Sequence, residues 1–533
     1  MLTKFVVVLG SVMSGLGKGV TSSSILKILD LYGYNVLPVK FDGYLNYDCG
    51  TMNPYRHGEV FVLDDKSEVD MDFGTYERFL DKDLTGESSI TGGKLFSEII
   101  EKERRGEFLG QDVQIIPHLS EMIIKKLENL GKSKRADVIV IEVGGTVGDI
   151  ENSYFIETMR QLALKHKTVF IDVTYVPELS VVGEQKTKPT QNAFRNIMAL
   201  GIAPDFIICR SERALSENVR SKLALYTNVN KNRVVDNHDL DTVYEVPLSL
   251  LRQGVDKELL KLLDLKKSKI NKKKLALYEE KVNRIISDGN RYIRVGIVGK
   301  YVDLKDSYVS VKEALLHAGV KSEVNINIDW IESETLEHSD PNSVLDKLDA
   351  IIVPGGFGKR GIEGMINAIK YAREKKVPFL GLCLGMQLMA IEYARNVCGI
   401  KNADSTEFDP KTKKNVIDII PEQIGVKYGG TMRLGAWKCK IANKDTIAYR
   451  AYRKTVVSER HRHRYELNNK FLGDLKKKGL VVSGTTMDGK LTEMIEWKDS
   501  FGIGTQAHPE LKSRLEKPAP LFVSLLEAAK ESL

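Results

Sequence analysis

Long apolar runs are missing from this chain of 533 residues. No stretch approaches the ~20 consecutive apolar residues that a membrane-spanning helix needs, so we expect no membrane association. Cysteine is also scarce: there are five, an odd number, scattered without the spacing of a zinc site. This usage is typical of reduced thiols, and we expect a cytoplasmic protein.

A strong charge of either sign is lacking too. The formal net charge is +7, which is small for this length and does not indicate a nucleic-acid partner. Basic residues concentrate in one stretch, residues 266–292, which has few apolar anchors. A basic patch for nucleic acid is one interpretation. Since no aromatic residues lie among the lysines of residues 266–274, an exposed linker between domains is favoured.

The remaining sequence alternates short apolar runs with helical segments. This pattern predicts parallel sheets covered by helices on both faces, so we expect an α/β protein. A chain of this length needs at least two domains, which we place at residues 1–265, with a doubly wound parallel sheet, and at residues 293–533. The expected strands are Phe5–Leu9, Asn35–Val39, Asp137–Val143, Thr168–Val173 and Asp205–Cys209, then Arg294–Gly299, Val324–Ile328, Ala350–Val353 and Val377–Leu382.

The second half contains the motif GLCLGMQ, residues Gly381–Gln387, directly after an apolar run. Gly-x-Cys-x-Gly at the end of a strand is typical of a nucleophile elbow, which exposes its side chain on a sharp turn. A helix N-terminus behind the turn favours the reactive thiolate of Cys383. On this motif alone, a buried structural cysteine remains an equal alternative.

Two further motifs favour catalysis. The sequence AHPE places His508 and Glu510 two residues apart, and VPGGFG, residues Val353–Gly358, offers backbone N–H groups for an oxyanion hole. In this order the three motifs resemble the class I glutamine amidotransferases. The resemblance implies that Cys383 attacks the glutamine amide, that His508 acts as base and acid, and that Glu510 orients the histidine.

The first half opens on GSVMSGLGKGV, residues Gly10–Val20, between an apolar run and a helical segment. A phosphate-binding loop lies in this position. The usual Gly-x₄-Gly-Lys-Ser/Thr pattern would put glycine where Val12 stands and a hydroxyl where Gly19 stands. A plain glycine-rich turn is therefore the alternative.

Acidic side chains near predicted strand ends indicate a metal. Lys40 and Asp42 follow the second strand, and Glu142 lies at the end of the third. Carboxylates at the carboxyl ends of parallel strands converge on one crevice, and Mg²⁺ prefers such oxygen ligands beside phosphates. For Asp70 and Asp72, spacing alone favours a solvated acidic face.

A second basic motif is GEQKTKPTQ, residues Gly183–Gln191, which suits either a polyphosphate or a plain surface loop. Together with the other motifs it resembles the CTP synthases over essentially the whole chain. The shared strings are GLGKG, NYDCGTM, HGEVFV, YERF, EVGGTVGDIE, KTKPTQ, VPGGFG, GLCLGMQ, STEF, GGTMRLG, RHRHRYE and HPE.

This resemblance implies a P-loop-like amidoligase domain followed by a class I glutamine amidotransferase domain. ATP would phosphorylate the uracil O4 of UTP, and ammonia from glutamine would displace phosphate to give CTP. The resemblance also implies Mg²⁺, activation by GTP, feedback inhibition by CTP, and homotetramers that are dimers of dimers and form filaments.

Site residues are implied in the same way. Lys18 and Lys40 would stabilise phosphoryl transfer, Asp72 and Glu142 would hold Mg²⁺, and His57 and Val60 would gate the ammonia passage. The ATP-binding residues would be Ser14, Gly15, Leu16, Gly17, Lys18, Gly19, Val20 and Asp72. The UTP- or CTP-binding residues would be Ser14, Asp149, Ile150, Glu151, Lys186, Thr187, Lys188, Pro189, Thr190, Gln191 and Lys222. The glutamine-binding residues would be Gly356, Leu384, Gly385, Met386, Gln387, Glu407 and Arg464, and Gly429–Gly435 resembles a lid associated with GTP.

Three positions depart from the family pattern. Gly43 and Cys49 stand where prolines are usual, and Tyr226 stands where phenylalanine is common. These changes bear on nucleotide affinity more than on the reaction. Two other functions stay open from the sequence: a nucleotide-switched assembly protein with an inactive glutaminase, and an ATP-dependent ligase acting on another carbonyl.

Overall fold

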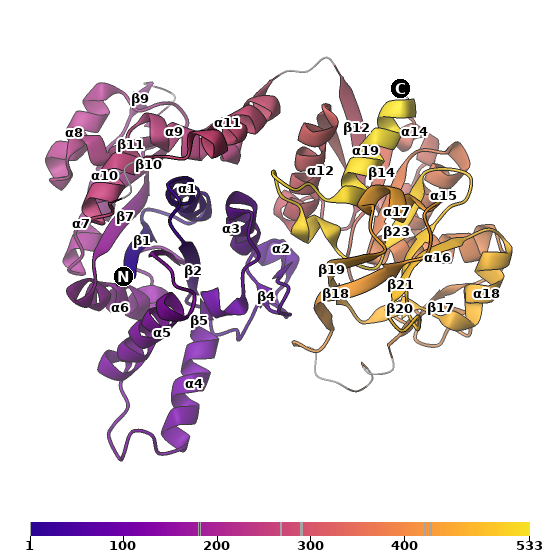
Figure 1. Cartoon of the computed structure of the whole chain (residues 1–533), viewed down its shortest axis with the longest axis horizontal. Coiled ribbons are helices and arrows are strands. Elements are labelled where there is room, and N and C mark those ends of the chain that lie inside the picture. The colour runs from indigo at the N-terminus through magenta and orange to yellow at the C-terminus, as the bar shows by residue number, and fades with distance from the viewer. Residues whose placement is uncertain are drawn as a thin grey trace. The chain divides into compact units, whose positions relative to one another are not determined.

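The computed structural model describes residues 2–179, 181, 183–266, 269–287, 291–420, 423, 425 and 429–532. The chain forms two compact α/β units (Figure 1). The first contains the residues up to Asp48 together with Thr75–Ile286, and the second contains Cys49–Gly74 together with the residues from Ser287 onwards. Residues 49–74 therefore leave the first unit and fold with the second, which differs from the expected boundary at residue 265.

The first unit is built on one parallel sheet with the strand order β11-β10-β7-β1-β6-β2-β5. The strands are β1 (Lys4–Gly10), β2 (Val36–Asp42), β5 (Ser89–Thr91), β6 (Val138–Val143), β7 (Thr168–Tyr175), β10 (Phe206–Ser211) and β11 (Val234–His238). The order reverses beside β1, with later strands added on both sides. A crevice for ligands forms at such a reversal, outside the carboxyl ends of the strands.

Helices cover both faces of this sheet. Phe5, Val7 and Leu9 on one face of β1 pack in a common core with residues of α4, α5 and α6, whereas α1 packs against β1, β2 and β6. The helices of this unit are α1 (Lys18–Leu31), α4 (Gly92–Arg104), α5 (Ser120–Ser133), α6 (Ser153–Lys165), α7 (Lys188–Ala199), α8 (Glu217–Thr227), α9 (Val246–Arg252), α10 (Val255–Leu262) and α11 (Lys272–Ile286), with α3 (Asp72–Leu80) leading into it. The expected doubly wound α/β sheet is confirmed.

The second unit contains a mixed sheet with the order β13-β12-β14-β15-β23-β22-β21-β18-β19. The strands from β13 to β23 pair in parallel, and the pairs from β23 to β19 are antiparallel. Their bounds are β12 (Tyr292–Gly299), β13 (Asn325–Glu332), β14 (Ala350–Val353), β15 (Phe379–Leu382), β18 (Arg433–Ile441), β19 (Val456–His463), β21 (Val481–Thr486), β22 (Thr492–Glu496) and β23 (Gly502–Thr505).

Two hydrophobic cores, one on each face, hold helices on this mixed sheet. The helices are α12 (Val309–Ser322), α13 (Thr335–His338), α14 (Pro341–Leu345), α15 (Ile362–Lys375), α16 (Leu384–Asn396), α17 (Ile447–Tyr452), α18 (Asn469–Lys477) and α19 (Pro520–Ser532). A small sheet adds β16 (Asp404–Ser405), β17 (Asn415–Ile419) and β20 (Tyr465–Leu467). Residues 49–74 contribute α2 (Pro54–His57) and a hairpin of β3 (Phe61–Val62) and β4 (Glu68–Val69).

Every strand expected from the sequence is present within a few residues of its predicted bounds. The short strand β5 and the strand β11 of the first unit were not expected. Neither were β18, β19, β21, β22 and β23, so the prediction of a purely parallel sheet in the second half is wrong. The charged stretch 266–292 is not simply an exposed linker, because α11 lies in it and buries Tyr278 and Val282. The sequence did not predict this helix, because its two buried side chains lie four residues apart among many charged residues.

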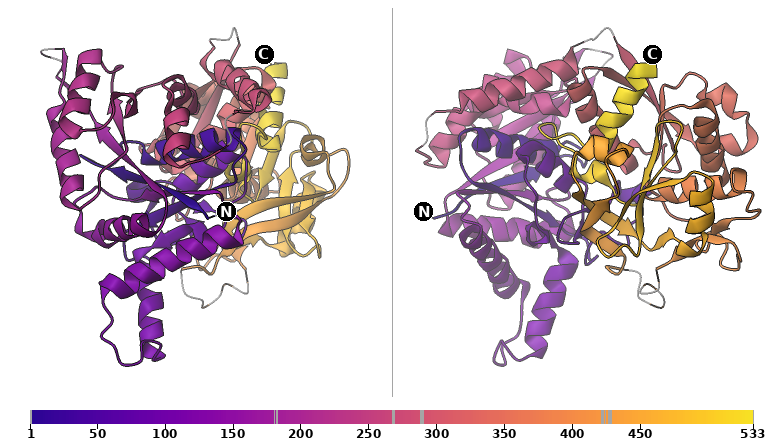
Figure 2. Two further views of the ribbon diagram at one scale, coloured as in Figure 1. Left: turned by 60° about the vertical axis from the view of Figure 1, so that its left-hand side comes forward. Right: turned by 45° about the vertical axis from the view of Figure 1, so that its right-hand side comes forward.

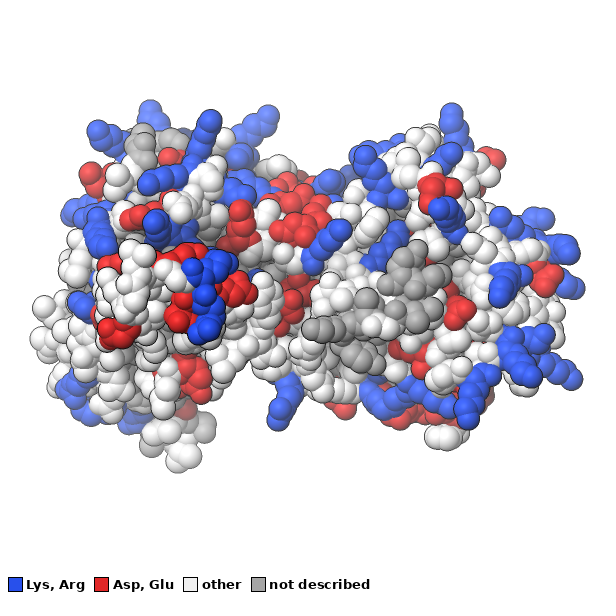
Figure 3. All heavy atoms as spheres, turned by 90° about the horizontal axis from the view of Figure 1, so that it is seen from below, with Lys and Arg blue, Asp and Glu red and all other residues white. Residues whose placement is uncertain are grey.

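The surface has one projecting part and no concentration of a single charge on the face shown. In the first unit, α4 and the chain leading to α5 project away from the sheet (Figure 2). On the described part of the face in Figure 3, Lys and Arg side chains are interspersed with Asp and Glu and form no single basic surface. Among the described residues, no helix has the length and apolar character to cross a membrane.

Candidate functional site

Cys383 lies at the sharp turn between β15 and α16. Its φ is 50° and its ψ is −98°, a conformation that a non-glycine residue rarely adopts. The flanking glycines are required by packing: a Cβ on Gly381 would lie 2.7 Å from the Gly385 carbonyl, and one on Gly385 would lie 2.1 Å from the Val353 carbonyl oxygen. Strained backbone of this kind clusters at functional sites, and this turn has the geometry of a nucleophile elbow.

His508 and Glu510 lie beside this turn. His508 Nδ1 is 2.6 Å from Glu510 Oε1, so the carboxylate accepts from Nδ1–H and leaves Nε2 toward the cysteine. Burial alone would lower the pKa of His508. Interactions with Glu510 and with Cys383 outweigh burial and raise this pKa well above its usual value. The site therefore favours the protonated imidazole of His508.

The Pro-Gly-Gly loop after β14 packs directly on this pair. A Cβ on Gly355 would lie 2.7 Å from His508 Cε1 and 3.7 Å from Cys383 Cβ. Cys383 Sγ also has polar neighbours, with Gln506 Nε2 at 3.6 Å and the Arg462 carbonyl oxygen at 3.8 Å. The loop thus lies where its backbone N–H groups can approach a carbonyl under attack.

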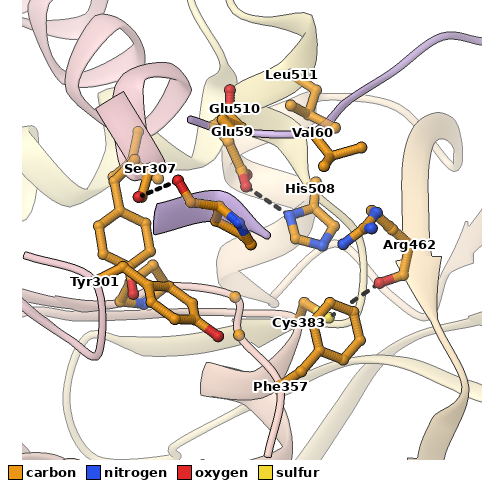
Figure 4. A pocket seen from close by; sticks show the side chains of 16 residues that line it. Glu59, Val60, Tyr301, Ser307, Phe357, Cys383, Arg462, His508, Glu510 and Leu511 are labelled. Carbon is orange, nitrogen blue, oxygen red and sulfur yellow. Dashed lines mark hydrogen bonds and ion pairs between the residues drawn. The ribbon is translucent and has the colours of Figure 1, made fainter. Parts of the chain in front are cut away.

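A pocket opens over the three residues (Figure 4). Residues 49–74 form part of its wall through Pro54, Glu59 and Val60. The other lining residues come from β12 onwards and include Tyr301, Ser307, Tyr308, Val311, Pro354, Gly355, Gly356, Phe357, Arg462 and Leu511. A small substrate that enters this pocket meets the thiol, the imidazole and the loop together.

We expect Gly355→Ala to damage this centre. The added Cβ must displace His508 or the loop, and misplacement by about 1 Å lowers rates on the order of 10²-fold. Glutamate release from glutamine measures the loss. Gly473→Ala is the matched control, because its Cβ meets open space in α18. Equal glutamate release by the two variants would contradict the prediction.

Several expected glutamine-binding residues gather around the elbow. Leu384, Gly385 and Met386 are buried in α16, and a Cβ on Gly356 would lie 3.2 Å from Leu384 Cδ2. Gln387 Nε2 donates to the Tyr465 carbonyl at 2.9 Å. Each of these residues has a structural partner, and their contact with glutamine stays a prediction.

Glu407 and Arg464, the expected charged pair for glutamine, lie on separate loops. Glu407 Oε1 accepts from the Gly358 backbone N–H at 2.7 Å, and burial raises its pKa. Arg464 contacts Gln423 Oε1 at 2.8 Å and Thr431 Oγ1 at 3.0 Å.

Lys300, which the sequence did not single out, donates to the Phe357 carbonyl at 3.1 Å, and burial lowers its pKa to about 8. The sequence did not indicate a role for Lys300, because a single lysine after an apolar strand is common.

The composition of the run RHRHR, residues 460–464, is by itself typical of a solvated basic strip, but the structure buries most of this run. It belongs to β19, and Arg460, His461 and His463 are almost fully buried. The two imidazoles touch, with Nδ1 of His461 3.0 Å from Nε2 of His463. Burial and neighbouring cations hold the pKa of both histidines well below the usual range. Both are therefore neutral in the fold.

Arg433, within the expected GTP-associated lid, is a buried anchor. Its Nη1 lies 3.0 Å from Glu466 Oε1 and its Nη2 lies 2.6 Å from Glu493 Oε1. The segment expected to form the lid therefore runs into β18, because Arg433 is the first residue of that strand. Pro421, Glu422, Ile424, Val426, Lys427 and Tyr428 lie outside the described residues.

We expect Arg433→Met to destabilise the second unit strongly. It leaves two buried carboxylates without their cation, which costs about 3–5 kcal/mol and lowers Tm by about 10 °C. Thermal unfolding measures the change. Lys438→Met, on the exposed side of the same strand, is the control, and equal Tm values would count against a structural role for the ion pairs.

The opening loop of the first unit has the backbone of a phosphate cradle. Gly15 and Gly17 have φ of 77° and 79°, and Val12 has φ of 79° although it is β-branched. The position where the usual pattern has glycine thus keeps a glycine-like conformation. Lys18 folds back over Gly10, and its Nζ donates to the Gly145 carbonyl at 2.7 Å.

A buried charged group lies at the ends of β2 and β6. Lys40 and Glu142 are adjacent in register, with Nζ 3.5 Å from Oε1, and Asp42 Oδ1 lies 3.7 Å from the same Nζ. Tyr76 donates to Glu142 Oε2. Asp72 begins α3, where its backbone N–H donates to Asp70 Oδ1 at 2.9 Å. Whether Asp72 and Glu142 share a metal stays a prediction.

The expected UTP residues fall into two sets. Asp149, Ile150 and Glu151 lie exposed on the loop after β6, where Asp149 Oδ2 accepts from the Thr146 N–H at 2.8 Å. The second set surrounds the start of α7. Within it Thr190 and Gln191 are buried and bonded to protein groups, whereas Lys186 is partly exposed and Lys222 on α8 is exposed. Nucleotide contacts by Thr190 and Gln191 would replace these bonds.

The family departures have plain structural contexts. A Cβ on Gly43 would lie 2.6 Å from the Glu151 carbonyl oxygen, so this chain has no room for a larger residue there. Cys49 is buried, and its N–H donates to the Glu68 carbonyl at 3.3 Å, a bond that proline would lose. Tyr226 is exposed, so its hydroxyl reaches water.

His57 and Val60, the expected ammonia gate, lie in different surroundings. Val60 is buried and lines the pocket, but His57 is exposed at the end of α2. Glu59 and Arg462 also line this pocket, although no role was expected for either. The string HGEVFV lies in a segment that lines the pocket, but nothing local indicated which of its side chains do so. An ammonia gate at His57 and Val60 stays a prediction.

Comparisons with known proteins agree with this architecture. Residues 4–265 match the family model described as CTP synthase N-terminus, and residues 303–528 match glutamine amidotransferase class-I. The chain is 50% identical to the CTP synthase of Pyrococcus abyssi over 538 residues, covering 99% of this chain and 98% of that protein. It is 48% identical to the CTP synthase of Caldanaerobacter subterraneus over 532 residues, with the same coverage of each.

Among solved structures, the glutaminase domain of Trypanosoma brucei CTPS with bound acivicin is 36% identical. It covers 45% of this chain and 94% of that one, with a TM-score of 0.42. The two family models and the full-length identity carry the assignment: the chain belongs to the CTP synthase family.

Proposed function

We propose that the chain catalyses the ATP-dependent amination of UTP to CTP with glutamine as the nitrogen donor. The observation that carries this proposal is the Cys383–His508–Glu510 arrangement in the pocket of a chain that matches CTP synthases from end to end. The glutaminase supplies ammonia, and the first unit uses ATP to activate the uracil O4.

The glutaminase chemistry follows from the geometry. Cys383 Sγ attacks the side-chain carbonyl carbon of glutamine, while backbone N–H groups of the Gly355 loop and of Leu384 face the developing oxyanion. His508 gives its Nε2 proton to the leaving ammonia and then takes one from the water that hydrolyses the thioester. Glu510 keeps the imidazole oriented and stabilises its charged form throughout.

The first unit performs the phosphoryl transfer. Lys18 beside the loop and Lys40 at the end of β2 offer two cations to the charge that develops on the transferring phosphate. Uracil O4 takes the γ-phosphate of ATP, ADP leaves, and ammonia then displaces phosphate at C4. The loop N–H groups at the start of α1 hold the phosphates in position.

Magnesium fits the donor set. Asp72 and Glu142 would supply hard oxygen ligands to Mg²⁺, which commonly takes its other ligands from water and nucleotide phosphates. Among the described residues, no group of three or more His, Cys, Asp and Glu side chains is placed to hold a metal ion. When bound, the ion would neutralise charge on the phosphates.

Regulation and assembly are proposed from the family. GTP activates glutamine hydrolysis, CTP inhibits at a site overlapping that of UTP, and the protein works in the cytoplasm as a homotetramer built from two dimers that also forms filaments. The partly exposed Lys186 and the exposed Lys222 and Asp149 are available to a triphosphate and its sugar. An inactive glutaminase is disfavoured, because the three catalytic side chains are complete and in contact.

One assay tests the proposal. Purified protein with UTP, ATP, Mg²⁺ and ammonium chloride should form CTP, followed by its absorbance. Omitting either nucleotide should stop the reaction. No CTP under the complete conditions would overturn the proposed function. Formation of an aminated product only from another carbonyl compound would instead favour a ligase of different specificity.

A further inference from the structure

Three ion pairs fasten the β3–β4 hairpin to the glutaminase core. Arg460 Nε lies 2.6 Å from Asp64 Oδ1, Lys512 Nζ lies 3.0 Å from Asp64 Oδ2, and Arg462 Nε lies 2.8 Å from Glu68 Oε1. We call these five residues the clasp. Its inner members are buried, since the side chain of Arg460 is 0% exposed and that of Glu68 is 1% exposed.

The two arginines of the clasp also touch the catalytic residues. The Arg460 carbonyl accepts from the backbone N–H of His508 at 2.7 Å, and the Arg462 carbonyl lies 3.8 Å from Cys383 Sγ. Each arginine therefore contacts the catalytic centre with its backbone and the hairpin with its guanidinium. A shift of the hairpin would therefore reach both catalytic residues through the C-terminal half of β19.

The turn of the hairpin also packs closely against β18. Gly435 of β18 has φ of 78°, and a Cβ there would lie 2.7 Å from Lys66 N and 2.8 Å from the Asp64 carbonyl oxygen. The Ala436 N–H donates to the same oxygen at 3.1 Å. The turn of the hairpin is thus fitted against the strand with no room for a side chain between them.

The segment before the hairpin forms a wall of the catalytic pocket. Pro54, Glu59 and Val60 line it together with Cys383 and His508. Glu59 and Val60 are labelled in Figure 4. Glu59 accepts a hydrogen bond from Ser310 at one end of this wall. At the other end, Val60 is followed by Phe61 and Val62, which are buried in β3. The Arg460 guanidinium lies 5.3 Å from the centre of the Phe61 ring, so the clasp holds the strand that directly follows Val60.

We propose that the clasp is a positioning device that keeps the wall closed, so that ammonia made at Cys383 is used for amination and not lost to solvent. This inference rests on the proposed function. Arg460, Asp64 and Glu68 act through the wall and do not line the pocket, whereas Arg462 both belongs to the clasp and lines the pocket. Loss of one charge leaves its buried partner unpaired, which favours an arrangement in which that partner reaches water.

The test compares products in one reaction. Glu68→Gln keeps the shape of the side chain and removes its charge. With glutamine as donor, we expect the ratio of glutamate released to CTP formed to rise on the order of threefold or more above that of the unaltered chain. With ammonium chloride as donor, CTP formation should be unchanged. Arg462→Lys, which keeps the cation, should raise the ratio less.

A purely structural role would change both products in parallel. An unchanged ratio in Glu68→Gln, whether or not the rates fall, would overturn the proposal. If that variant does not fold, Asp64→Asn, whose side chain is 33% exposed, is measured in its place with the same criteria. Asp474→Asn, in an exposed pair with Lys477, is the matched control. Absence of CTP with ammonia in the unaltered chain would contradict the proposed function and not the clasp.

Discussion

Cys383→Ala will abolish CTP formation from glutamine and leave CTP formation from ammonia intact. The substitution removes the only atom of the centre that forms a bond to the substrate, and losing a catalytic nucleophile lowers turnover on the order of 10⁴-fold or more. The side chain is small and lies at a turn whose backbone is held by Gly381, Gly385 and the Thr505 carbonyl. Alanine therefore fits without disturbing the fold.

Two parallel assays measure this result, one with glutamine and one with ammonium chloride as nitrogen donor. Cys398→Ala serves as the matched control, because this half-buried cysteine contacts the Asp474 carbonyl and not the catalytic residues. If ammonia-dependent synthesis disappeared together with glutamine-dependent synthesis, separate sites for the two half-reactions would be ruled out. Retained glutamine-dependent synthesis would exclude Cys383 as the nucleophile.

The sequence was informative where the chemistry depends on neighbours in the chain. A nucleophile elbow is a local turn, so the motif of Gly381, Cys383 and Gly385 predicts it without knowledge of the rest of the fold. His508 and Glu510 are two residues apart, and their hydrogen bond follows from that spacing once the turn is in place. The strands were equally readable, because buried parallel strands are continuous apolar runs.

Burial of charge could not be predicted in the same way. Arg460 is fully buried, yet its carboxylate partner Asp64 lies 396 residues earlier in the chain. Composition favours the surface for an Arg/His run, and only the pairing brought by the fold offsets desolvation. The same reason explains why residues 49–74 were assigned to the first domain: their contacts with the second unit are long-range and carry no local signal.

Val12 illustrates how far a motif can depart from its pattern while the backbone keeps its form. Its φ of 79° costs on the order of 1–3 kcal/mol for a β-branched residue, and strain of that size persists where surrounding structure enforces it. The loop is thus shaped for a ligand at the expense of local stability. Lys18, the first residue of α1, is the cation that directly follows this loop.

Lys18→Met should therefore have the opposite signature to Cys383→Ala. Without the cation that folds over Gly10, CTP formation should fall on the order of 10²–10³-fold with either nitrogen donor, whereas hydrolysis of glutamine to glutamate should continue. Lys165→Met, on an exposed position of α6, is the matched control for loss of a lysine in the same unit. CTP made from ammonia at the control rate would exclude Lys18 from phosphoryl transfer. A loss confined to the glutamine assay would place its role in the glutaminase, because only the amination step is shared by both donors.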